Sequence, residues 1–370
     1  MKTDQTQAWP EIWRAGGSNT GATPELARAI EAEGWDGQMF MDSQCLSADP
    51  YAQMGVWACS TQRLKLSTGV TNPLTRNLAV TAGAAATIQA ITGGRAVLGI
   101  GRGDSALAYL GHAPVTVARF EQALRHLQVL LSGGEIPFAE FGTAGDAGSV
   151  HGLSLGARPE AVQLKWLPEG LPKVPLDAAV TGPKVIALSA RIAERVTFSV
   201  GAEPERLTWA LDLARAARAE AGMDPEGISY GAQVVVVCHA DPDVALDVAM
   251  HMVPPLARFQ VMQGKAGQGA QGDGATARDE SLESVRQGYD MTKHGGAHQR
   301  DRIVGGGLSP EFVQRFAVVG TPGHCHARLR ELLDLGLTRL VLVGPGFYPP
   351  AWGDAANLFA REVLPALKAG

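Results

Sequence analysis

The sequence contains few cysteines and carries little net charge. Its four cysteines, in a chain of 370 residues, are widely separated and form no C-x-x-C pair. That spacing argues against a disulfide scaffold and a zinc ribbon, and it fits a reducing cytoplasm. The 32 basic and 37 acidic residues leave a net charge of −5. This balance argues against a general nucleic-acid binder and against a protein that binds anionic membranes.

Long apolar runs and two common catalytic motifs are also missing. No apolar stretch reaches the roughly 18 residues that a membrane span needs. The first residues, Met1–Gln5, lack the apolar core of a secretory signal. Neither a G-x-S-x-G nor a Walker A sequence is present. We therefore expect a cytoplasmic protein without a membrane segment.

The chain does contain enough apolar material for a large core. Hydrophobic residues make up 45% of the sequence and charged residues 19%, which predicts a folded rather than a disordered protein. The 45 glycines and 22 prolines are dispersed without a G-X-Y period, which excludes a collagen-like fibre. The length is compatible with two or three ordinary domains, or with one large barrel.

Short β-type runs alternate with helical stretches along the chain. The first helix shows the typical boundaries, with Thr23 as N-cap, Pro24 in the first turn and Gly34 after the last turn. Eight β-type runs are predicted as strands, at residues 11–15, 35–42, 64–70, 96–101, 174–180, 195–200, 228–238 and 339–343.

Eight strands with intervening helices predict an α/β fold, a (β/α)8 TIM barrel that forms a single domain over residues 1–370. An open doubly wound sheet is the alternative. Two glycine-rich insertions interrupt the pattern, 132–172 after the fourth strand and 264–307 after the seventh. Loops that follow barrel strands lie at the catalytic C-terminal face, so both insertions are expected over that face.

The most informative block of sequence surrounds the third and fourth strands. It contains Gly69-Val70-Thr71-Asn72-Pro73-Leu74-Thr75-Arg76-Asn77, Thr92-Gly93-Gly94-Arg95 and Gly99-Ile100-Gly101-Arg102-Gly103-Asp104. This block resembles the luciferase-like monooxygenase superfamily. Within the superfamily it is most similar to the deazaflavin-dependent branch that includes methylenetetrahydromethanopterin reductase. The resemblance extends over about residues 11–345 and implies a (β/α)8 barrel, in agreement with the strand count.

The resemblance implies a flavin-type cofactor in the barrel mouth, either coenzyme F420, which is a deazaflavin, or FMN. In the deazaflavin branch a non-proline cis peptide and a bulge back the cofactor ring at the position of Gly69 and Val70, which Thr71 and Asn72 follow. Gly101 would let the ring approach the backbone at the end of the fourth strand. From the residues alone, an alternative to the cis peptide and bulge is that Gly69 and Val70 form an ordinary strand end before an Asn-Pro turn.

Thr181, Gly182, Pro183 and Lys184 follow the fifth strand and open a helix. Free backbone N–H groups at a helix N-terminus bind anions, and a proline there removes only a donor that would otherwise be unpaired. The family places the cofactor phosphate at a Gly-Pro of this kind, so the resemblance assigns these four residues to phosphate binding. Without the resemblance they are a plain helix start.

Two carboxylates are predicted at the site. Asp104 ends the fourth strand, where the family often has a carboxylate that serves as an acid or orients the substrate; a helix N-cap is the alternative. Asp42 ends the second strand and could hydrogen-bond the cofactor; an ordinary turn aspartate is the alternative. Several relatives have a histidine after this aspartate. This chain has Ser43 there, so a histidine-based mechanism is not carried over.

His294 lies in the second glycine-rich insertion and is the candidate for a lid residue that reaches the substrate. A solvated loop histidine is the alternative. His324, Cys325 and His326 are adjacent in the sequence, and adjacent residues of a helix do not face each other. No metal site is therefore predicted.

Together, these residues and the resemblance predict an oxidoreductase that transfers a hydride to or from a small organic substrate. A monooxygenase that uses reduced FMN and O2 is the first alternative. A non-redox barrel enzyme that binds a phosphorylated compound through residues 181–183 is the second. Relatives are commonly dimers, so a homodimer is expected, and the apolar helix from Tyr51 to Cys59 would suit its interface. Core packing is the commoner explanation for such a helix.

Overall fold

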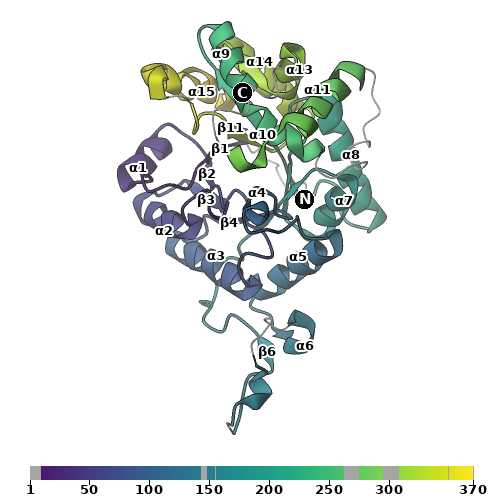
Figure 1. The fold of residues 1–370 in the computed structure, drawn as a ribbon. Coiled ribbons are helices and arrows are strands. Elements are labelled where there is room, and N and C mark those ends of the chain that lie inside the picture. The colour runs from purple at the N-terminus through teal and green to yellow at the C-terminus, as the bar shows by residue number, and fades with distance from the viewer. Residues whose placement is uncertain are drawn as a thin grey trace, which may run out of the picture.

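The computed structural model describes residues 10–142, 148–154, 156–261, 275–294, 308–348 and 350–369. Eight parallel strands follow one another around a closed barrel, and β11 pairs with β1 to complete it (Figure 1). They are β1 (Glu11–Gly16), β2 (Gly37–Phe40), β3 (Lys65–Thr68), β4 (Ala96–Ile100), β7 (Leu176–Val180), β8 (Arg195–Phe198), β9 (Ser229–Cys238) and β11 (Arg339–Val343). The predicted (β/α)8 barrel is confirmed, and the open sheet is wrong because the ring of strands closes.

Long helices cover the outside of the barrel between successive strands (Figure 1). They are α1 (Pro24–Ala32), α2 (Pro50–Ser60), α3 (Leu78–Thr92), α5 (Val117–Leu131), α7 (Pro183–Ile192), α8 (Pro204–Glu220), α9 (Pro242–Met252) and α14 (Pro322–Asp334), followed by the C-terminal α15 (Leu364–Lys368). The ends of these helices are set by residues that are close to them in the sequence. The Thr23 hydroxyl accepts from the Leu26 N–H at the start of α1, and Gly93 ends α3 with a φ of +63°.

One strand that adjoins the barrel was not predicted. The short β10 (Val318–Gly320) pairs with the last three residues of β9, while β11 pairs with the earlier part of the same strand. A helix, α13 (Pro310–Phe316), leads into it. The ten-residue β9 therefore continues beyond the barrel, because its two halves have different partners on the same edge. None of the described helices is both long and apolar enough to cross a membrane.

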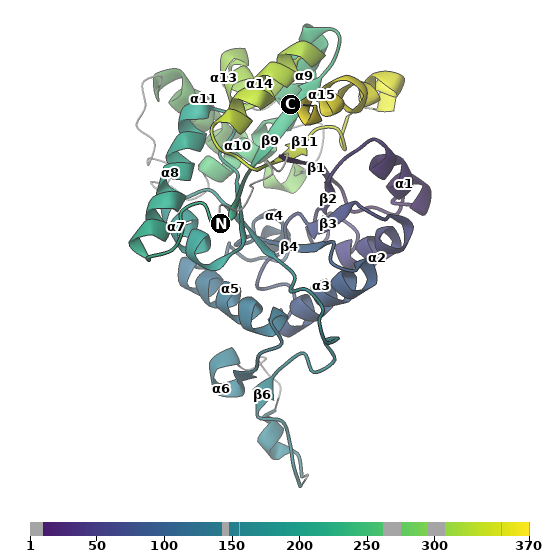
Figure 2. The same ribbon diagram turned by 180° about the vertical axis from the view of Figure 1, so that it is seen from behind.

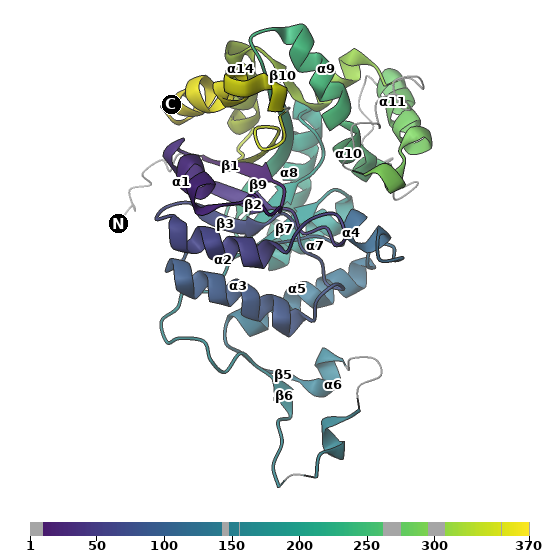
Figure 3. The ribbon, with the colours of Figure 1, turned by 60° about the vertical axis from the view of Figure 1, so that its left-hand side comes forward.

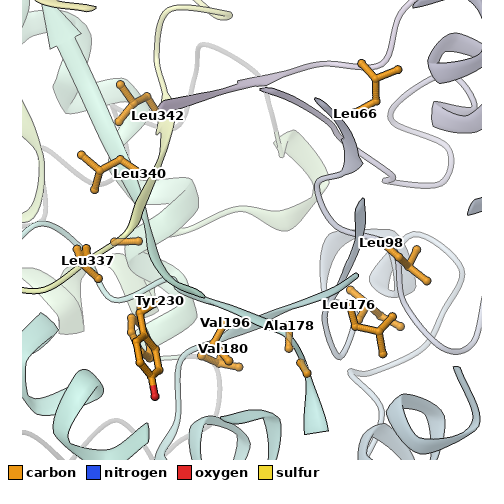
Figure 4. Close-up of a cluster of buried hydrophobic side chains, with 14 of the residues drawn as sticks. Leu66, Leu98, Leu176, Ala178, Val180, Val196, Tyr230, Leu337, Leu340 and Leu342 are labelled. Atoms are coloured by element: carbon orange, nitrogen blue, oxygen red, sulfur yellow. The ribbon is translucent and has the colours of Figure 1, made fainter. Parts of the chain in front are cut away.

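The strands alternate between two environments. One set of side chains points outward and packs beneath the helices, as Figure 4 shows for Leu66, Leu98, Leu176 and Leu340. The other set fills the interior with Trp13, Ala15, Met39, Val97 and Val341. This alternation follows from the two-residue period of a strand. Apolar residues on both faces explain why the strands are near-continuous hydrophobic runs in the sequence.

A network of charged side chains fills the interior at the N-terminal ends of the strands. Asp177 on β7 lies 3.0 Å from Arg339 Nη2 on β11 and 3.7 Å from Arg195 Nε on β8. Arg195 also pairs with Glu11 at 2.6 Å, and Glu11 contacts Lys65. Arg339 and Asp177 are 0% and 1% exposed. The network therefore consists of buried charges that compensate one another.

Lowering the pH is expected to weaken this network through Glu11. Although burial raises the pKa of Glu11, Arg195 and Lys65 outweigh it and lower that pKa from 4.5 to about 2. A carboxylate with a lowered pKa in the folded state stabilises the protein above its unfolded pKa and loses that contribution as the pH falls. Urea unfolding of the wild type and of Glu11→Gln should differ above about pH 4.5 and converge towards pH 2. A difference that is independent of pH would contradict this assignment.

The first insertion lies elsewhere than predicted. Residues 132–172 follow α5 rather than a strand, and they contain β5 (Ile136–Pro137), α6 (Phe138–Phe141), η1 (Val150–Gly152) and β6 (Ala161–Val162). Their contacts are with the outer sides of α3 and α5: the Phe141 ring stacks on His126, and Gln122 donates to the Glu140 carbonyl. Figure 1 and Figure 2 show this part extending outward from the barrel. The expectation that it covers the catalytic face is wrong, because α5 carries the chain away from that face first.

Candidate active site

Three interior positions near the mouth of the barrel, at the C-terminal ends of the strands, carry small residues. Ala15 on β1, Gly99 on β4 and Ala179 on β7 alternate with the outward-facing core residues. A Cβ on Gly99 would come within 2.0 Å of the Thr68 carbonyl oxygen, so the close approach of β3 and β4 requires glycine. Small interior side chains leave room at the mouth for a ligand that lies against the backbone.

The bulge that the resemblance implies after β3 is present. Ser67 pairs with Val97, and the next pairing joins Thr71 to Ile100, so the β3 side has one extra residue. The Gly69–Val70 peptide in this bulge is cis, as predicted. The bulge brings Val70 against β4, where its Cγ2 lies 3.0 Å from the position of a Cβ on Gly101. Gly69, Val70 and Gly101 thus meet at the mouth, where they were predicted to back a cofactor ring.

Thr71 and Asn72 follow the bulge and are buried. The Asn72 side-chain oxygen accepts hydrogen bonds from the N–H groups of Leu74 and Thr75, at 3.0 Å each. Its amide nitrogen and the Thr71 hydroxyl have no hydrogen-bond partner within the described part of the chain. Buried polar atoms are normally paired, so these two atoms are available to a ligand.

Asp42, after β2, is held in a buried ion pair. Its side chain is 2% exposed and lies 2.5 Å from Arg76 Nη1, while its other oxygen accepts from Gln44 at 2.6 Å. Arg76 also pairs with Asp49 at 2.8 Å, and its guanidinium lies over the Tyr51 ring. Both oxygens of Asp42 therefore already have partners. A direct hydrogen bond from the cofactor to Asp42 stays a prediction.

Asp104 follows β4 and occupies the N-cap position of the short helix α4 (Ser105–Ala108), but its side chain makes no capping hydrogen bond. One carboxylate oxygen instead contacts the guanidinium of Arg258, which belongs to the short helix η2 (Arg258–Gln260) after β9 and α10 (Pro254–Ala257). Arg258 is 3% exposed. Asp104 is therefore the N-cap residue by position, as the alternative interpretation has it, but its carboxylate pairs with Arg258 instead of capping the helix.

His294 belongs to the same group of side chains. Its Nδ1 is hydrogen-bonded to the Tyr289 hydroxyl, and the Tyr289 ring lies under the Arg258 guanidinium, 5.3 Å from it. The Tyr109 hydroxyl, just after α4, donates to the Met291 carbonyl at 2.9 Å. Asp104 and His294, predicted separately, are thus connected through Arg258 and Tyr289. We call these four residues the Asp104 cluster.

The protonation of the Asp104 cluster follows from its burial. Burial, and then the charge of Arg258, lower the pKa of His294 to about 4. Burial raises the pKa of Tyr289 to about 12. Both side chains are therefore neutral at neutral pH. In the tautomer in which the Tyr289 hydroxyl donates to Nδ1, the ring proton of His294 lies on Nε2 and can be donated to a ligand.

The second insertion provides Tyr289 and His294. Its described part, residues 275–294, contains α11 (Ala275–Gly288) and η4 (Met291–Lys293) and lies at the same end of the barrel as α4 and α10 (Figure 3). Residues 264–274 and 295–307 of the predicted lid lie outside the described residues. The placement of Tyr289 and His294 beside Arg258 agrees with the expectation that this insertion approaches the mouth.

The start of α7 presents backbone N–H groups at the mouth. Gly182 is its N-cap, Pro183 occupies the first turn, and no side chain of the described residues caps this end. A Cβ on Gly182 would meet no atom of the described chain within 4 Å. Thr181 is half-buried and Lys184 is exposed. These features fit an anion site at a helix N-terminus, and phosphate binding by these four residues stays a prediction.

Arg76 and Arg258 were missed in the sequence. Arg76 stands inside the informative block, but nothing in its spacing shows that it pairs with Asp42. Arg258 stands in Pro254–Gln260, a stretch without a recognisable motif. Within the described residues, no group of three or more histidine, cysteine, aspartate or glutamate side chains could hold a metal ion.

Comparisons with known proteins agree with this geometry. Residues 6–339 match the family model of luciferase-like monooxygenases. The 5,10-methylenetetrahydromethanopterin reductase of Methanolobus tindarius is 27% identical, over 91% of this chain and 94% of that protein. The coenzyme F420 dependent tetrahydromethanopterin reductase from Methanopyrus kandleri superposes with a TM-score of 0.71 at 21% identity, over 98% of this chain and 100% of the other. An F420-dependent secondary alcohol dehydrogenase, solved with an F420-acetone adduct, has a TM-score of 0.69 at 18% identity, over 97% and 99%.

Proposed function

Since the chain belongs to the luciferase-like monooxygenase family, we propose that this oxidoreductase binds coenzyme F420 at the barrel mouth and transfers a hydride to or from a small organic substrate. The observation that carries the proposal is the bulge after β3, which places Val70 beside Gly101 at a mouth that carries small interior residues. A flat ring can lie against such a backbone surface. The similarity to a coenzyme F420 dependent tetrahydromethanopterin reductase over nearly the whole chain favours F420 over FMN.

The residues present fit a phosphorylated flavin-type cofactor in three ways. The bulge supports the ring, Thr71 and Asn72 offer unpaired polar atoms, and the α7 N-terminus offers backbone donors to a phosphate. When bound, such a cofactor supplies the hydride chemistry, and the protein supplies position and electrostatics. Gly182 is the position where a side chain would interfere with the cofactor alone, because a Cβ on Gly69 or Gly101 would first meet Met39 or Val70.

The Asp104 cluster is assigned to the substrate. A carboxylate paired with a guanidinium is an anion, so Asp104 accepts hydrogen bonds and orients Arg258 rather than acting as an acid. Arg258 in turn supports the Tyr289 ring, which holds the neutral imidazole of His294. His294 Nε2–H is then the group that donates to a polar atom of the substrate.

Cofactor titration tests the proposal. Protein freed of cofactor should bind F420 with a Kd at least about tenfold lower than that for FMN, measured by cofactor fluorescence. Turnover with F420 should be equal with and without air, because a hydride transfer consumes no oxygen. Tighter binding of FMN and turnover that requires O2 would establish the monooxygenase alternative instead. Binding of neither cofactor would overturn the proposal.

Gly182→Val is expected to fold and to bind the cofactor about tenfold or more weakly. A Cβ at this position meets no described atom of the chain within 4 Å, but it stands before the N–H groups of α7. Cofactor titration by fluorescence measures the effect. Gly323→Val, in the first turn of α14, is the matched control, because a Cβ there is also unobstructed. Equal Kd values in the two variants would place the phosphate elsewhere.

The proposal includes a homodimer through α2 and α3. Neither helix contains a charged residue, and Val56, Val80 and Ile91 are 42%, 59% and 49% exposed on them. We call the outer sides of α2 and α3 the α2–α3 face. Near a two-fold axis each residue meets its own copy, so a surface without charge is complementary to itself. Sedimentation equilibrium would measure the association.

A further inference from the structure

The first insertion forms a projection that its own barrel does not cover. We call its described residues, 135–142, 148–154 and 156–171, the arm. In Figure 3 the arm extends away from the barrel beyond α3 and α5. The β5–β6 ladder joins only two residues on each side, and α6 has four residues. Leu153 and Trp166 are 50% and 49% exposed. The described arm therefore has little internal pairing and exposes two large apolar side chains.

The base of the arm is continuous with the α2–α3 face. Leu164 is 9% exposed and packs on α3, where its Cδ2 lies 3.9 Å from the position of a Cβ on Gly83. Gly83 lies one helical turn after Val80 on the outer side of α3. Trp166 follows Leu164 by two residues in the chain. The arm therefore begins at the edge of the surface that the proposed homodimer buries.

We propose that the arm docks on a second copy of this chain and buries Trp166 there. This inference rests on the proposed homodimer. The α2–α3 face favours a second copy of this chain as the partner. Near a two-fold axis each residue lies beside its own copy, so uncharged residues are compatible with the interface and charged residues repel each other. An arm that starts at the edge of that face and points away from its own barrel reaches the partner. Tryptophan is also among the residues that contribute most to interfaces.

Sedimentation equilibrium on the cofactor-free full chain tests the proposal. Trp166→Ala is expected to raise the dimer Kd by about 30-fold or more, the loss typical of a tryptophan hot spot. Phe347→Ala is the matched control and should leave the Kd unchanged, because Phe347 is 37% exposed but lies in the loop after β11. An unchanged Kd for Trp166→Ala, or a wild-type chain that stays monomeric at about 100 μM, would overturn the proposal.

Limited trypsin digestion of the wild type gives a second test that needs no substitution. The exposed Lys165 precedes Trp166, whereas the bond after Arg158 is protected from trypsin by Pro159. Cleavage after Lys165, followed by mass spectrometry, should slow by about tenfold or more when the protein concentration passes from below to above the dimer Kd. Equal cleavage rates at both concentrations would refute docking of the arm.

These measurements separate the two proposals. Neither the dimer Kd nor the cleavage rate requires a cofactor, so an enzyme that binds neither F420 nor FMN could still show the effect of Trp166→Ala. Conversely, a chain that binds F420 with an unchanged dimer Kd in Trp166→Ala would retain the proposed function and lose only the docking of the arm.

Discussion

Replacing Asp177 by asparagine is expected to lower the free energy of unfolding by about 3–5 kcal/mol, the cost of leaving a buried charge without its partner. Asp177 lies 3.0 Å from Arg339 Nη2 and 3.7 Å from Arg195 Nε, and it accepts from the Thr197 hydroxyl at 2.7 Å. Asparagine preserves the shape and the hydrogen-bonding oxygen but removes the charge. Arg339, which is fully buried, would then lack its counter-charge. Urea unfolding measures the loss.

Glu226→Gln is the control for Asp177→Asn. It also removes a carboxylate charge from a pair with an arginine, Arg215, but Glu226 is 61% exposed. Exposed pairs contribute about 0–1 kcal/mol. The double variant Asp177→Asn with Arg339→Met should recover part of the loss, because it removes both buried charges. Equal effects of Asp177→Asn and Glu226→Gln would show that the interior network contributes no more than a surface pair.

Asp104→Asn is expected to lower turnover by about 10²–10⁴-fold, in the range of lost acid–base or orienting groups. The cofactor Kd should change by no more than about threefold. Removing the carboxylate leaves Arg258 without its partner, and Arg258 supports the Tyr289 ring that holds His294. Steady-state kinetics and cofactor titration of the same preparation measure both quantities. If Asp104→Asn kept the turnover of the wild type, the Asp104–Arg258 pair would only stabilise the loop after β4.

His294→Ala gives a test of whether the Asp104 cluster acts as one unit. If Asp104 acts through His294, the double variant should lose little more turnover than His294→Ala alone. Because the pKa of His294 is about 4, the imidazole stays neutral above about pH 5, and wild-type turnover should be insensitive to this group in that range. Additive losses in the double variant would indicate that the two residues act independently.

The predicted placements of the two insertions differ in outcome, although each insertion follows a helix in the chain. The helix α5 precedes residues 132–172, and α9 and α10 precede residues 264–307. Residues 132–172 follow α5, although that helix was itself recognisable in the sequence at about residues 116–131. The described part of the second insertion does approach the mouth, through the contact between Tyr109 and Met291. Knowing which strand precedes an insertion was therefore not enough to predict the face of the barrel on which the insertion lies.

The cofactor side of the site was more predictable than the substrate side. The bulge and the cis peptide at Gly69–Val70 are encoded in one contiguous block, so a family resemblance carries them over directly. The α7 N-terminus is likewise four consecutive residues. The Asp104 cluster joins residues from the loops after β4 and β9, and no local pattern connects Asp104 to Arg258 or to His294.

The sequence by itself determined the strands, the helix ends and the number of barrel units. These features depend on hydrophobic period and on caps such as Thr23 and Gly93, which act within one or two turns of the chain. Closure of the barrel alone decided which charges meet. Arg339 pairs with Asp177 across the interior because the first residues of β7 and β11 lie at the same end of the closed barrel. Such a pairing depends on the register of strands that are distant in sequence, and no local propensity specifies that register.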